Sequence, residues 1–359
     1  MKIVHITTHA GQGGDWTALA GLSSVFLQNG NRVHIYGSGS STRVRNGHEL
    51  YLNKGASGFA RSSMILREIL SSTDIVHCHS LAALALAVQL KLASKHTFRV
   101  VYTFHWAVNS GRIKRFVAKR LILRSDIIHA PSHDAGDYLS ELYGIPRSKI
   151  SICHFGVDAQ RFTPLSQGQH SLVRKRLGIP ENNFVAVYAG RLAPEKGVGQ
   201  IIDFFGRHNP PNTQALIVGN GDLKAQLLAK RDAYGLRDKV FFVPHTDSVE
   251  EMYRAANLLL LPSVSHETFG LVVVEAALCG VPSLRSNLQG AQDQIIDGCS
   301  GFLYDPGHPT AFDDKLLSVL LNPDRLTRVG ENARKVALER FSYEKMYDRF
   351  YQLYMNTIG

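Results

Sequence analysis

The stretch around residue 270 carries two glutamates, Glu267 and Glu275, with seven residues between them. The apolar run Leu258–Leu261 before it has the length of a buried strand, and Pro262 ends that strand. Gly270 opens an apolar, β-branched run that predicts a helix, so both carboxylates can face one ligand in front of it. Helix N-termini favour anions, and two carboxylates there are unsuited to a phosphate. They favour hydroxyl groups instead, such as those of a sugar ring and a ribose.

Two cationic side chains follow another predicted strand, Phe184–Tyr188. Arg191 and Lys196 bracket the turn between this strand and the next helix. A rigid guanidinium and an ammonium group at such a turn can clamp a diphosphate. Gly219 lies in a further glycine-containing loop, which follows the predicted strand Ala215–Val218. This half of the chain therefore predicts separate places for phosphates and for hydroxyl groups.

The first predicted βαβ unit has a glycine-rich turn, a usual place for a ligand in a parallel sheet. Gly11 and Gly13 nearly give the dinucleotide fingerprint, but Trp16 occupies its third glycine position. The second strand runs into Gly37 without the acidic residue that would bind a ribose, so a dehydrogenase is a poor interpretation. A turn that approaches a phosphate and a plain tight turn both stay open.

Several predicted strands end in polar residues, and His105 is the most prominent of these. It follows the predicted strand Val100–Phe104 and precedes Trp106. Ligands bind along the carboxyl edge of a parallel sheet, so His105 is a candidate for contacting a substrate hydroxyl. A structural histidine is the competing interpretation.

Strands and helices alternate along the chain, which predicts an α/β fold with parallel, doubly wound sheets. The predicted strands are Ile3–Ile6, Arg32–Tyr36, Ile75–Cys78, Val100–Phe104, Ile127–Ala130, Ile150–His154, Phe184–Tyr188, Ala215–Val218, Val240–Val243, Leu258–Leu261, Pro282–Leu284 and Gly301–Leu303. Predicted helices include Trp16–Gln28, Leu81–Leu92 and Ala135–Tyr143. The polar stretch Thr163–Gln169 is interpreted as a linker between two Rossmann-like halves, which would bind a ligand in a cleft between them.

The composition fits a globular protein of two ordinary domains, with 359 residues, 44% hydrophobic and 19% charged. No apolar run reaches the ~20 residues that span a bilayer, and the N-terminal residues predict a strand rather than a signal peptide. The formal charge of +10 indicates attraction to a nucleotide, a membrane surface or nucleic acid. Four cysteines without CxxC spacing are expected to be buried, reduced thiols of a cytosolic protein: Cys78, Cys153, Cys279 and Cys299.

The segment Gly111–Arg124 is strongly basic. Its apolar residues Ile113, Phe116, Val117 and Leu121 form one helical stripe. Two interpretations stay open. The segment is either an ordinary surface helix packed on the sheet or a docking face for anionic lipid.

Together these motifs resemble the retaining glycosyltransferases of the glycosyltransferase 4 family, which have the GT-B fold. The resemblance rests on the E-x7-E stretch from Glu267 to Glu275 and on the turns Gly13-Gly14, Gly190-Arg191, Lys196-Gly197 and Gly219-Asn220-Gly221. It implies two Rossmann-like domains facing a central cleft, with a C-terminal helix that returns to the first domain. The expected limits are 1–165 for an acceptor-binding domain, 166–340 for a nucleotide-sugar-binding domain and 341–359 for the helix.

The resemblance also implies a role for each site residue. Arg191 and Lys196 would bind the donor diphosphate. Glu275 would bind the ribose, and Glu267 and His105 would contact the transferred sugar. The catalytic candidates are therefore His105, Glu267, Arg191 and Lys196. The donor-binding candidates are Gly13, Gly14, Gly190, Arg191, Lys196, Gly219, His245, Thr246, Glu267, Phe269, Gly270, Leu271 and Glu275.

The implied reaction moves a hexose or N-acetylhexosamine from a UDP- or GDP-linked sugar to a glycan or lipid-linked acceptor, in the synthesis of cell-surface polysaccharide, lipopolysaccharide or glycolipid. The leaving diphosphate gains negative charge, which the two cations would stabilise. The sequence has no Asp-x-Asp triplet, so we expect neither a metal ion nor another cofactor. No carboxylate nucleophile is evident, and the resemblance implies front-face transfer with retention. We expect a cytoplasmic enzyme, peripheral on the inner face of the cytoplasmic membrane.

Two other hypotheses stay open. A nucleotide-sugar epimerase on the same two-domain scaffold would use the diphosphate clamp without an acceptor. A nucleotide- or nucleic-acid-binding module would account for the charge, but the chain has no recognisable motif with interleaved aromatic residues. Glu267 and Glu275 would then have no function, so we expect no nucleic acid partner.

Overall fold

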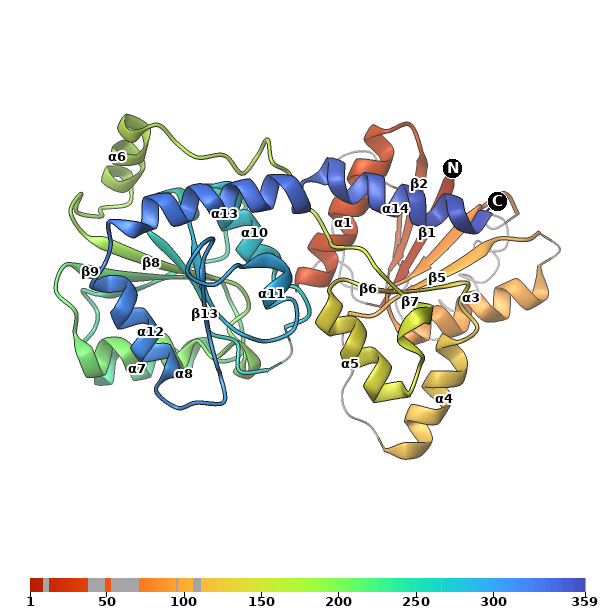
Figure 1. Ribbon diagram of the computed structural model, residues 1–359, viewed down its shortest axis with the longest axis horizontal. Coiled ribbons are helices and arrows are strands. Elements are labelled where there is room, and N and C mark those ends of the chain that lie inside the picture. The colour runs from red at the N-terminus through yellow and green to blue at the C-terminus, as the bar shows by residue number, and fades with distance from the viewer. Residues whose placement is uncertain are drawn as a thin grey trace. The chain divides into compact units, whose positions relative to one another are not determined.

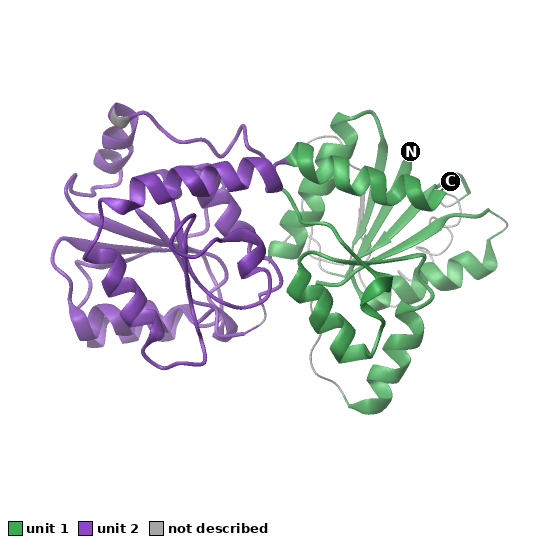
Figure 2. Ribbon diagram, viewed as in Figure 1, with its two compact units in different colours: residues 1–156, 343–359 green, residues 157–342 purple. Residues whose placement is uncertain are grey.

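A computed structural model describes residues 1–8, 13–37, 49–52, 71–94, 96–105, 111–265 and 267–358. The chain forms two compact units (Figures 1 and 2), residues 1–156 with 343–359 and residues 157–342. Each unit contains one parallel β-sheet with helices packed on it, as the sequence predicts. Gly11 and Trp106 lie outside the described residues.

The first unit has a seven-stranded parallel sheet in the order β3-β2-β1-β4-β5-β6-β7. Its strands are β1 (Lys2–Thr7), β2 (Arg32–Gly37), β3 (Glu49–Leu52), β4 (Ile75–Cys78), β5 (Arg99–Thr103), β6 (Ile127–Ala130) and β7 (Ile150–Ile152). Every strand predicted for this unit is confirmed, with small shifts at some ends. The edge strand β3 was missed, because a strand of four residues is too short to show a hydrophobic period.

Two groups of helices belong to this unit (Figure 1). They are α1 (Gly13–Gln28), α3 (Leu81–Ala93), α4 (Arg112–Ile122), α5 (His133–Tyr143) and α14 (Tyr343–Ile358), with a short 3-10 turn, η1 (Arg147–Lys149). Helix α1 packs against α14, whereas α3, α4 and α5 pack in a row. The C-terminal helix therefore returns to the first unit, as predicted. Helix α1 begins at Gly13 rather than at the predicted Trp16.

Alternation along the strands gives the two faces of this sheet different chemistry. Val4 and Ile6 join the hydrophobic core that includes residues of α3 and α5. His5 points the other way and pairs across the ladder with His77, whose ring contacts Tyr354 of α14. One face of the sheet is therefore apolar, and the other buries imidazoles beneath the C-terminal helix.

The second unit has a six-stranded parallel sheet in the order β10-β9-β8-β11-β12-β13. Its strands are β8 (Phe184–Ala189), β9 (Thr213–Val218), β10 (Val240–Val243), β11 (Leu258–Leu261), β12 (Ser283–Ser286) and β13 (Phe302–Tyr304). Its helices are α6 (Gln167–Arg176), α7 (Gly199–His208), α8 (Lys224–Ala233), α9 (Val249–Ala255), α10 (Leu271–Leu278), α11 (Ala291–Gln294), α12 (Ala311–Leu320) and α13 (Arg325–Phe341), with the 3-10 turn η2 (Pro194–Lys196). All the strands predicted for this half are present.

The chain passes from the first unit to the second between Gly156 and Val157, earlier than the predicted boundary at residue 165. The Val157 N–H donates to the Phe341 carbonyl at 2.8 Å. Arg254 of α9 donates to the Thr163 carbonyl at 2.8 Å. These bonds attach the residues before 165 to the second unit. The functional roles given to the two halves stay predictions.

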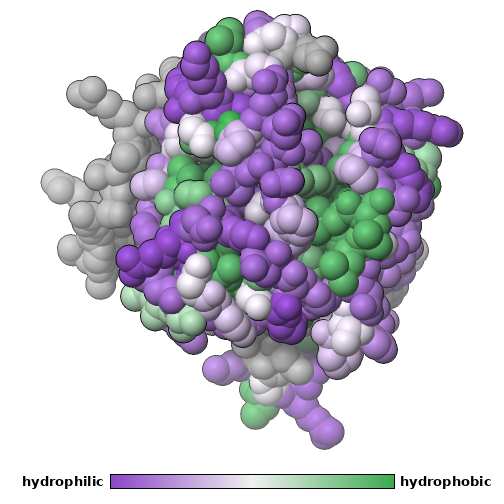
Figure 3. Space-filling model, turned by 90° about the vertical axis from the view of Figure 1, so that its left-hand side faces the viewer, coloured by the Kyte–Doolittle hydropathy of each residue, from purple (hydrophilic) through white to green (hydrophobic). Residues whose placement is uncertain are grey.

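Two further expectations need correction. The predicted linker ends at Ser166, because the backbone N–H of Ser166 donates to the Gln169 side chain and this capping box begins α6. Cys299 is exposed rather than buried, whereas the other three cysteines are buried and all four are free thiols. The view in Figure 3 shows one face of the molecule, on which hydrophilic side chains predominate.

Helix α4 does not present its apolar residues as an ordinary surface helix packed on the sheet would. Ile113, Phe116 and Val117 are 81%, 56% and 59% exposed, whereas Ala118 and Ile122 are buried. Three residues of the predicted stripe therefore face away from the unit, whereas its fourth residue, Leu121, is partly buried against the hydrophobic core. Among the described helices, none is both long and apolar enough to cross a bilayer.

Candidate functional site

Three loops meet at the carboxyl ends of β8, β9 and β11 in the second unit. Gly219 has a φ of +143°, and a Cβ there would overlap the carbonyl oxygen of Gly190. Gly197 has a φ of +62°, and a Cβ there would overlap the carbonyl oxygen of Pro262. Glycine is required at residues 197 and 219 because any side chain would push the loops apart. A donor contact for Gly190 and Gly219 stays a prediction.

An ion pair joins two of these loops. Lys196, at the end of η2, donates from Nζ to the Oε2 atom of Glu267 at 2.7 Å. Ser263 Oγ donates to the same oxygen at 3.2 Å. Glu267 is only 8% exposed. The structure therefore brings together two of the predicted catalytic residues, which are 71 positions apart.

The charge of Glu267 depends on its neighbours. Burial alone raises the pKa of this carboxyl. The cations of Lys196 and Arg285, with the hydrogen bonds from Lys196 and Ser263, outweigh burial, so the pKa lies below its usual value. Glu267 is consequently a buried anion at neutral pH.

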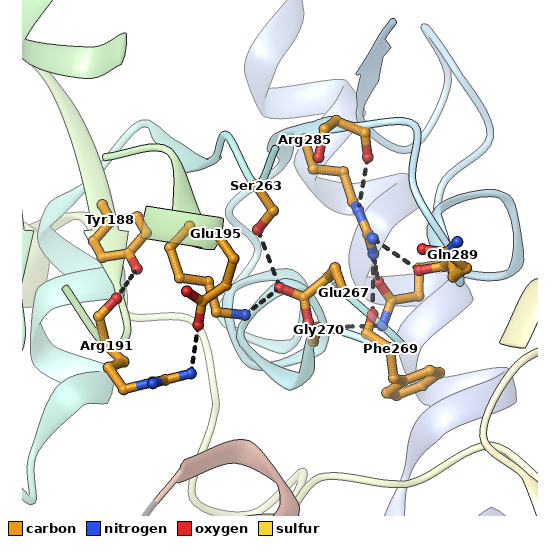
Figure 4. Close-up of polar contacts among 12 residues, drawn as sticks. Tyr188, Arg191, Glu195, Ser263, Glu267, Phe269, Gly270, Arg285 and Gln289 are labelled. Carbon is orange, nitrogen blue, oxygen red and sulfur yellow. Dashed lines mark hydrogen bonds and ion pairs between the residues drawn. The ribbon is translucent and has the colours of Figure 1, made fainter. Parts of the chain in front are cut away.

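Arg191 lies differently from Lys196. Its side chain is largely exposed and forms an ion pair with Glu195 four residues later. Its backbone is fixed instead, because the Tyr188 hydroxyl donates to the Arg191 carbonyl at 2.8 Å (Figure 4). The backbone of Arg191 is thus fixed while its guanidinium stays in solvent. Because a surface ion pair contributes little stability in water, the guanidinium can leave Glu195 and bind an anionic ligand.

Glu275 has a partner that the sequence did not indicate. The hydroxyl of Tyr253, on α9, donates to Glu275 Oε2 at 2.7 Å, and both residues are buried. Burial raises the pKa of Glu275, against the opposing effect of the Tyr253 hydrogen bond. The two glutamates of the E-x7-E stretch therefore have separate partners and pKa values shifted in opposite directions.

The remaining donor-site candidates lie at strand ends or at a helix start. Phe269 is buried, Gly270 has a φ of +83°, and Leu271 is the first residue of α10. His245 is exposed and Thr246 half-buried in the loop after β10, where the Thr246 hydroxyl accepts from a backbone N–H. Their roles toward a donor stay predictions.

Arg285 on β12 is not among the residues predicted for the site. This side chain is fully buried and lies beside the residues that lead into α10 (Figure 4). The available signal was a charged residue inside a strand otherwise made of Ser283, Leu284 and Ser286. Lysine and arginine are almost never fully buried unless their charge is paired or fully hydrogen-bonded.

In the first unit, His105 follows β5 and is buried. Its Nε2 lies 2.9 Å from Nδ1 of His79, and its Nδ1 lies 3.3 Å from a carboxylate oxygen of Asp15 in the first turn of α1. Gly13 and Gly14 open that helix, and among the described residues no atom outside the adjacent backbone lies within 4 Å of where a Cβ would stand on either. A ligand contact for Gly13 and Gly14 stays a prediction. Both ring nitrogens of His105 have partners within the unit.

His105 belongs to a larger buried network. His79 Nε2 lies 3.0 Å from His5 Nδ1, and His77 contacts the Tyr354 hydroxyl at 2.7 Å. Thr103 Oγ1 links His77, at 2.5 Å, to His129, at 2.8 Å. Burial lowers the pKa of His77 and His79 well below the usual value and that of His129 to about 3, so these imidazoles are neutral.

One group of three histidines has the composition of a metal site. Nitrogens of His5, His77 and His79 lie within 4.8 Å of one another. The rings of His77 and His79, however, stack at 4.4 Å, whereas metal ligands direct their in-plane lone pairs at one point. These nitrogens also take part in the hydrogen bonds described above. The geometry therefore favours a hydrogen-bonded network.

Two family models match this chain, one in each half. Residues 13–161 match the model of Glycosyltransferase Family 4, and residues 170–336 match that of Glycosyl transferases group 1. Each model matches less than half of the chain, and the two matched regions follow one another along it. Both are glycosyltransferase models, which agrees with the predicted family resemblance.

Two curated relatives and one solved structure illustrate this. The D-inositol 3-phosphate glycosyltransferase of Xylanimonas cellulosilytica is 28% identical over 63% of this chain and 56% of its own length. The N-acetyl-alpha-D-glucosaminyl L-malate synthase of Bacillus anthracis is 24% identical over 100% of this chain and 98% of its own. The chain thus spans just over half of the first relative and nearly all of the second.

The solved structure confirms the fold. Anabaena Alr3699/HepE in complex with UDP-glucose superimposes with a TM-score of 0.87 at 21% identity, covering 99% of this chain and 100% of that chain. The predicted α/β fold of the GT-B kind, with two sheet-containing domains, is therefore correct.

Proposed function

We propose that this protein transfers a hexose or N-acetylhexosamine from a UDP- or GDP-linked sugar to a glycan or lipid-linked acceptor, with retention of anomeric configuration. The observation that carries the proposal is the Lys196–Glu267 ion pair, 2.7 Å long, at the carboxyl edge of the second sheet. It sets a cation suited to a diphosphate beside a buried anion suited to sugar hydroxyls. The relatives support a nucleotide-sugar reaction, since the Anabaena protein binds UDP-glucose.

The two cations of the second unit would stabilise the leaving group. Bond cleavage between the sugar and the phosphate moves negative charge onto the diphosphate. Lys196 and the outward guanidinium of Arg191 would pair with that charge, at the expense of the Arg191–Glu195 surface contact. No Asp-x-Asp triplet is present in the sequence, and we propose that the cations take the place of a metal ion.

Hydroxyl recognition falls to the carboxylates. Glu267, held ionised by Lys196 and Arg285, would accept from hydroxyls of the transferred sugar. Glu275 uses one oxygen for Tyr253, which leaves its other oxygen to accept from the ribose. From the first unit, we assign His105 a contact with the donor sugar, which requires one of its ring nitrogens to exchange its present partner for the ligand.

Transfer can be tested directly. The purified protein is incubated with UDP-glucose, UDP-N-acetylglucosamine, UDP-galactose and GDP-mannose, each with membrane lipid extract and with surface glycan fragments. D-inositol 3-phosphate and L-malate serve as small acceptors, because the names of the relatives contain them. Mass spectrometry finds the product, and proton NMR gives its anomeric configuration. Absence of transfer from all four donors would contradict the proposal, and an inverted linkage would contradict retention.

The donor incubated without acceptor separates transfer from epimerisation. An isomerised nucleotide sugar would indicate the epimerase hypothesis. We favour transfer because both matched families are glycosyltransferase families.

We also propose that α4 docks the first unit on an anionic membrane at its cytoplasmic face. Its exposed Ile113, Phe116 and Val117 can enter the headgroup region, and the basic residues around them attract anionic lipid. These basic residues are Arg112, Lys114, Arg115, Lys119, Arg120 and Arg124. The proposed lipid-linked acceptor would reside on that surface.

Vesicle sedimentation tests the docking. We expect binding to vesicles with anionic phosphatidylglycerol and not to neutral phosphatidylcholine, and we expect Phe116→Asp to abolish it. Leu321→Asp is the matched control, because Leu321 is 80% exposed in the second unit. Equal, negligible binding to both vesicles would remove this proposal and leave the transferase proposal intact.

A further inference from the structure

Arg285 is the largest fully buried side chain among the described residues. Its Nη1 donates to the Phe269 carbonyl at 3.0 Å and to Gln294 Oε1 at 2.5 Å. Its Nη2 donates to the Gln289 carbonyl at 3.2 Å, and its Nε to the Ser286 carbonyl at 3.3 Å. A buried guanidinium is costly unless its donors are satisfied. Here they are directed mainly at backbone carbonyls.

Gln294 extends this arrangement by one residue. Its Nε2 donates to the Gly270 carbonyl at 3.2 Å, while its Oε1 accepts from Arg285. The carbonyls of Phe269 and Gly270, which immediately precede α10, are therefore both held from the same side. Figure 4 shows Arg285 on that side of the loop.

The two hydrogen-bonded carbonyls fix where the following N–H groups point. In a planar trans peptide the N–H is antiparallel to the C=O. The N–H groups of Gly270 and Leu271 consequently point away from Arg285. Gly270 contributes to this geometry with a φ of +83°, and a Cβ on it would come within 3.4 Å of Arg285 Nη1.

We propose that Arg285 and Gln294 are positioning residues, which hold the Phe269–Leu271 backbone so that its N–H groups bind the donor and which keep the loop close to Glu267. This inference rests on the proposed function and names two residues that it does not require. Arg285 has a second effect through its charge, since it acts on Glu267 together with Lys196. The geometric role depends on the planar guanidinium, which directs its hydrogen bonds to the loop. The electrostatic role depends on its positive charge, which acts on Glu267.

The uncharged partner gives the cleanest test. Gln294→Leu removes the bond to the Gly270 carbonyl and one acceptor of Arg285, but it leaves the buried charge and the other Arg285 bonds in place. We expect the donor KM to rise about 5- to 10-fold, with a smaller change in kcat, because one hydrogen bond to the backbone is lost. An unchanged donor KM would overturn the proposal, provided that the wild-type protein transfers sugar. If the wild type transfers none, the proposed function itself has failed.

Two substitutions at Arg285 separate its roles. Arg285→Lys keeps the charge and loses the planar fork, whereas Arg285→Met loses both. We expect both variants to raise the donor KM at least about 10-fold, through the lost hydrogen bonds. Equal donor KM values in Arg285→Lys and the wild type would overturn the geometric role.

The pH profile isolates the charge. Lys196, Ser263 and Tyr188 also surround Glu267, and none of them changes in these variants. Loss of the Arg285 cation favours the protonated carboxyl, so the acid limb of kcat/KM moves to higher pH in Arg285→Met and stays in place in Arg285→Lys. Superimposable profiles for the wild type and Arg285→Met would overturn the electrostatic role.

The same unit supplies a matched control. Arg174 is also buried and also donates chiefly to backbone carbonyls, but at the opposite edge of the sheet, before β8 and β11 begin. Its acceptors are the carbonyls of Glu181, Asn183 and Ala255 and the side chain of Asn257. Arg174→Met should lower Tm as Arg285→Met does and leave the donor KM unchanged. A rise in donor KM that follows Tm equally in both variants would overturn the proposal.

Discussion

Both units bury polar side chains among the strands of a parallel sheet, but the first unit buries imidazoles and the second buries ions. His77, His79 and His129 are neutral, because burial depresses their pKa values. Glu267 remains charged, because its pairing with Lys196 at 2.7 Å helps to hold its pKa below the usual value. The two networks therefore avoid an unpaired buried charge in different ways. The histidines of the first unit are neutral, whereas the carboxylate of the second unit is paired with a cation.

The proposed function uses both kinds of group. The diphosphate would bind cations of the second unit. The hydroxyl groups would bind the carboxylates Glu267 and Glu275 of the second unit and the imidazole of His105 in the first, because a hydroxyl can both donate and accept. The neutral network also carries a liability, since each of its histidines can be protonated under mildly acidic conditions once it is exposed.

The largest expected effect is a loss of stability of the first unit in acid. Unfolded histidines take up a proton near their ordinary pKa of 6.5, whereas folded His129 does so only near 3. The unfolded state thus binds more protons in this window, so stability is full above pH 6.5 and falls as the pH drops. Each buried histidine contributes at most about 1.4 kcal/mol per pH unit.

Hydrogen exchange at pH 7.5 and pH 5.5, corrected for intrinsic rates, measures this. We expect protection to fall in β1, β4 and β6 and to hold in β8 and β11. Glu267 has a lowered pKa, so its contribution is lost only as the pH falls below the ordinary carboxyl value of about 4.5. Equal loss of protection in both units would contradict the comparison.

Removing one charge from the second network should have the next largest effect. Lys196→Ala deletes a partner of Glu267 and a proposed ligand of the diphosphate. We expect transfer to slow about 10- to 100-fold, because charged hydrogen bonds are worth about 1.5–3 kcal/mol. Lys315→Ala is the control, since Lys315 forms an exposed ion pair with Asp297 in the same unit. Wild-type activity in Lys196→Ala would refute the assigned site.

The sequence predicted the sheets well, because buried parallel strands are short apolar runs that end at turn residues. Leu258–Leu261 and Val240–Val243 were predicted at their observed limits. The positions of Arg191, Lys196 and Glu267 in loops after strands were also predictable, whereas their roles toward a donor stay predictions. Which of these side chains pair with one another was not predictable. Lys196 and Glu267 are 71 positions apart, and only the sheet order makes their loops neighbours.

Partners that depend on tertiary packing were missed for the same reason. Tyr253 reaches Glu275 because α9 packs against α10, which no spacing in the sequence indicates. The orientation of α4 was also ambiguous, because its hydrophobic period does not say which face meets the sheet. Exposure of Phe116 resolves it.

Removal of one buried hydroxyl in the second unit should have a smaller effect. Tyr253→Phe leaves Glu275 without a donor at 2.7 Å in a buried place. We expect a loss of about 1.5–3 kcal/mol at pH 7.5, as for hydrogen bonds to charged groups. Urea unfolding followed by hydrogen exchange in α9 and α10 measures it. A loss that vanishes at pH 4, where the carboxyl is protonated, would support the ionic origin, and a loss independent of pH would contradict it.

The smallest expected effect comes from the corresponding change in the first unit. Tyr354→Phe removes the hydroxyl that contacts His77 at 2.7 Å beneath α14. Because the imidazole is neutral, we expect a loss of only about 0.5–1.5 kcal/mol, measured by exchange in α14 and β4. Tyr351→Phe, on a half-buried ring of the same helix, controls for the loss of a tyrosine hydroxyl. If Tyr354→Phe costs as much as Tyr253→Phe at pH 7.5, the neutral and ionic networks do not differ in the way that their pKa shifts require.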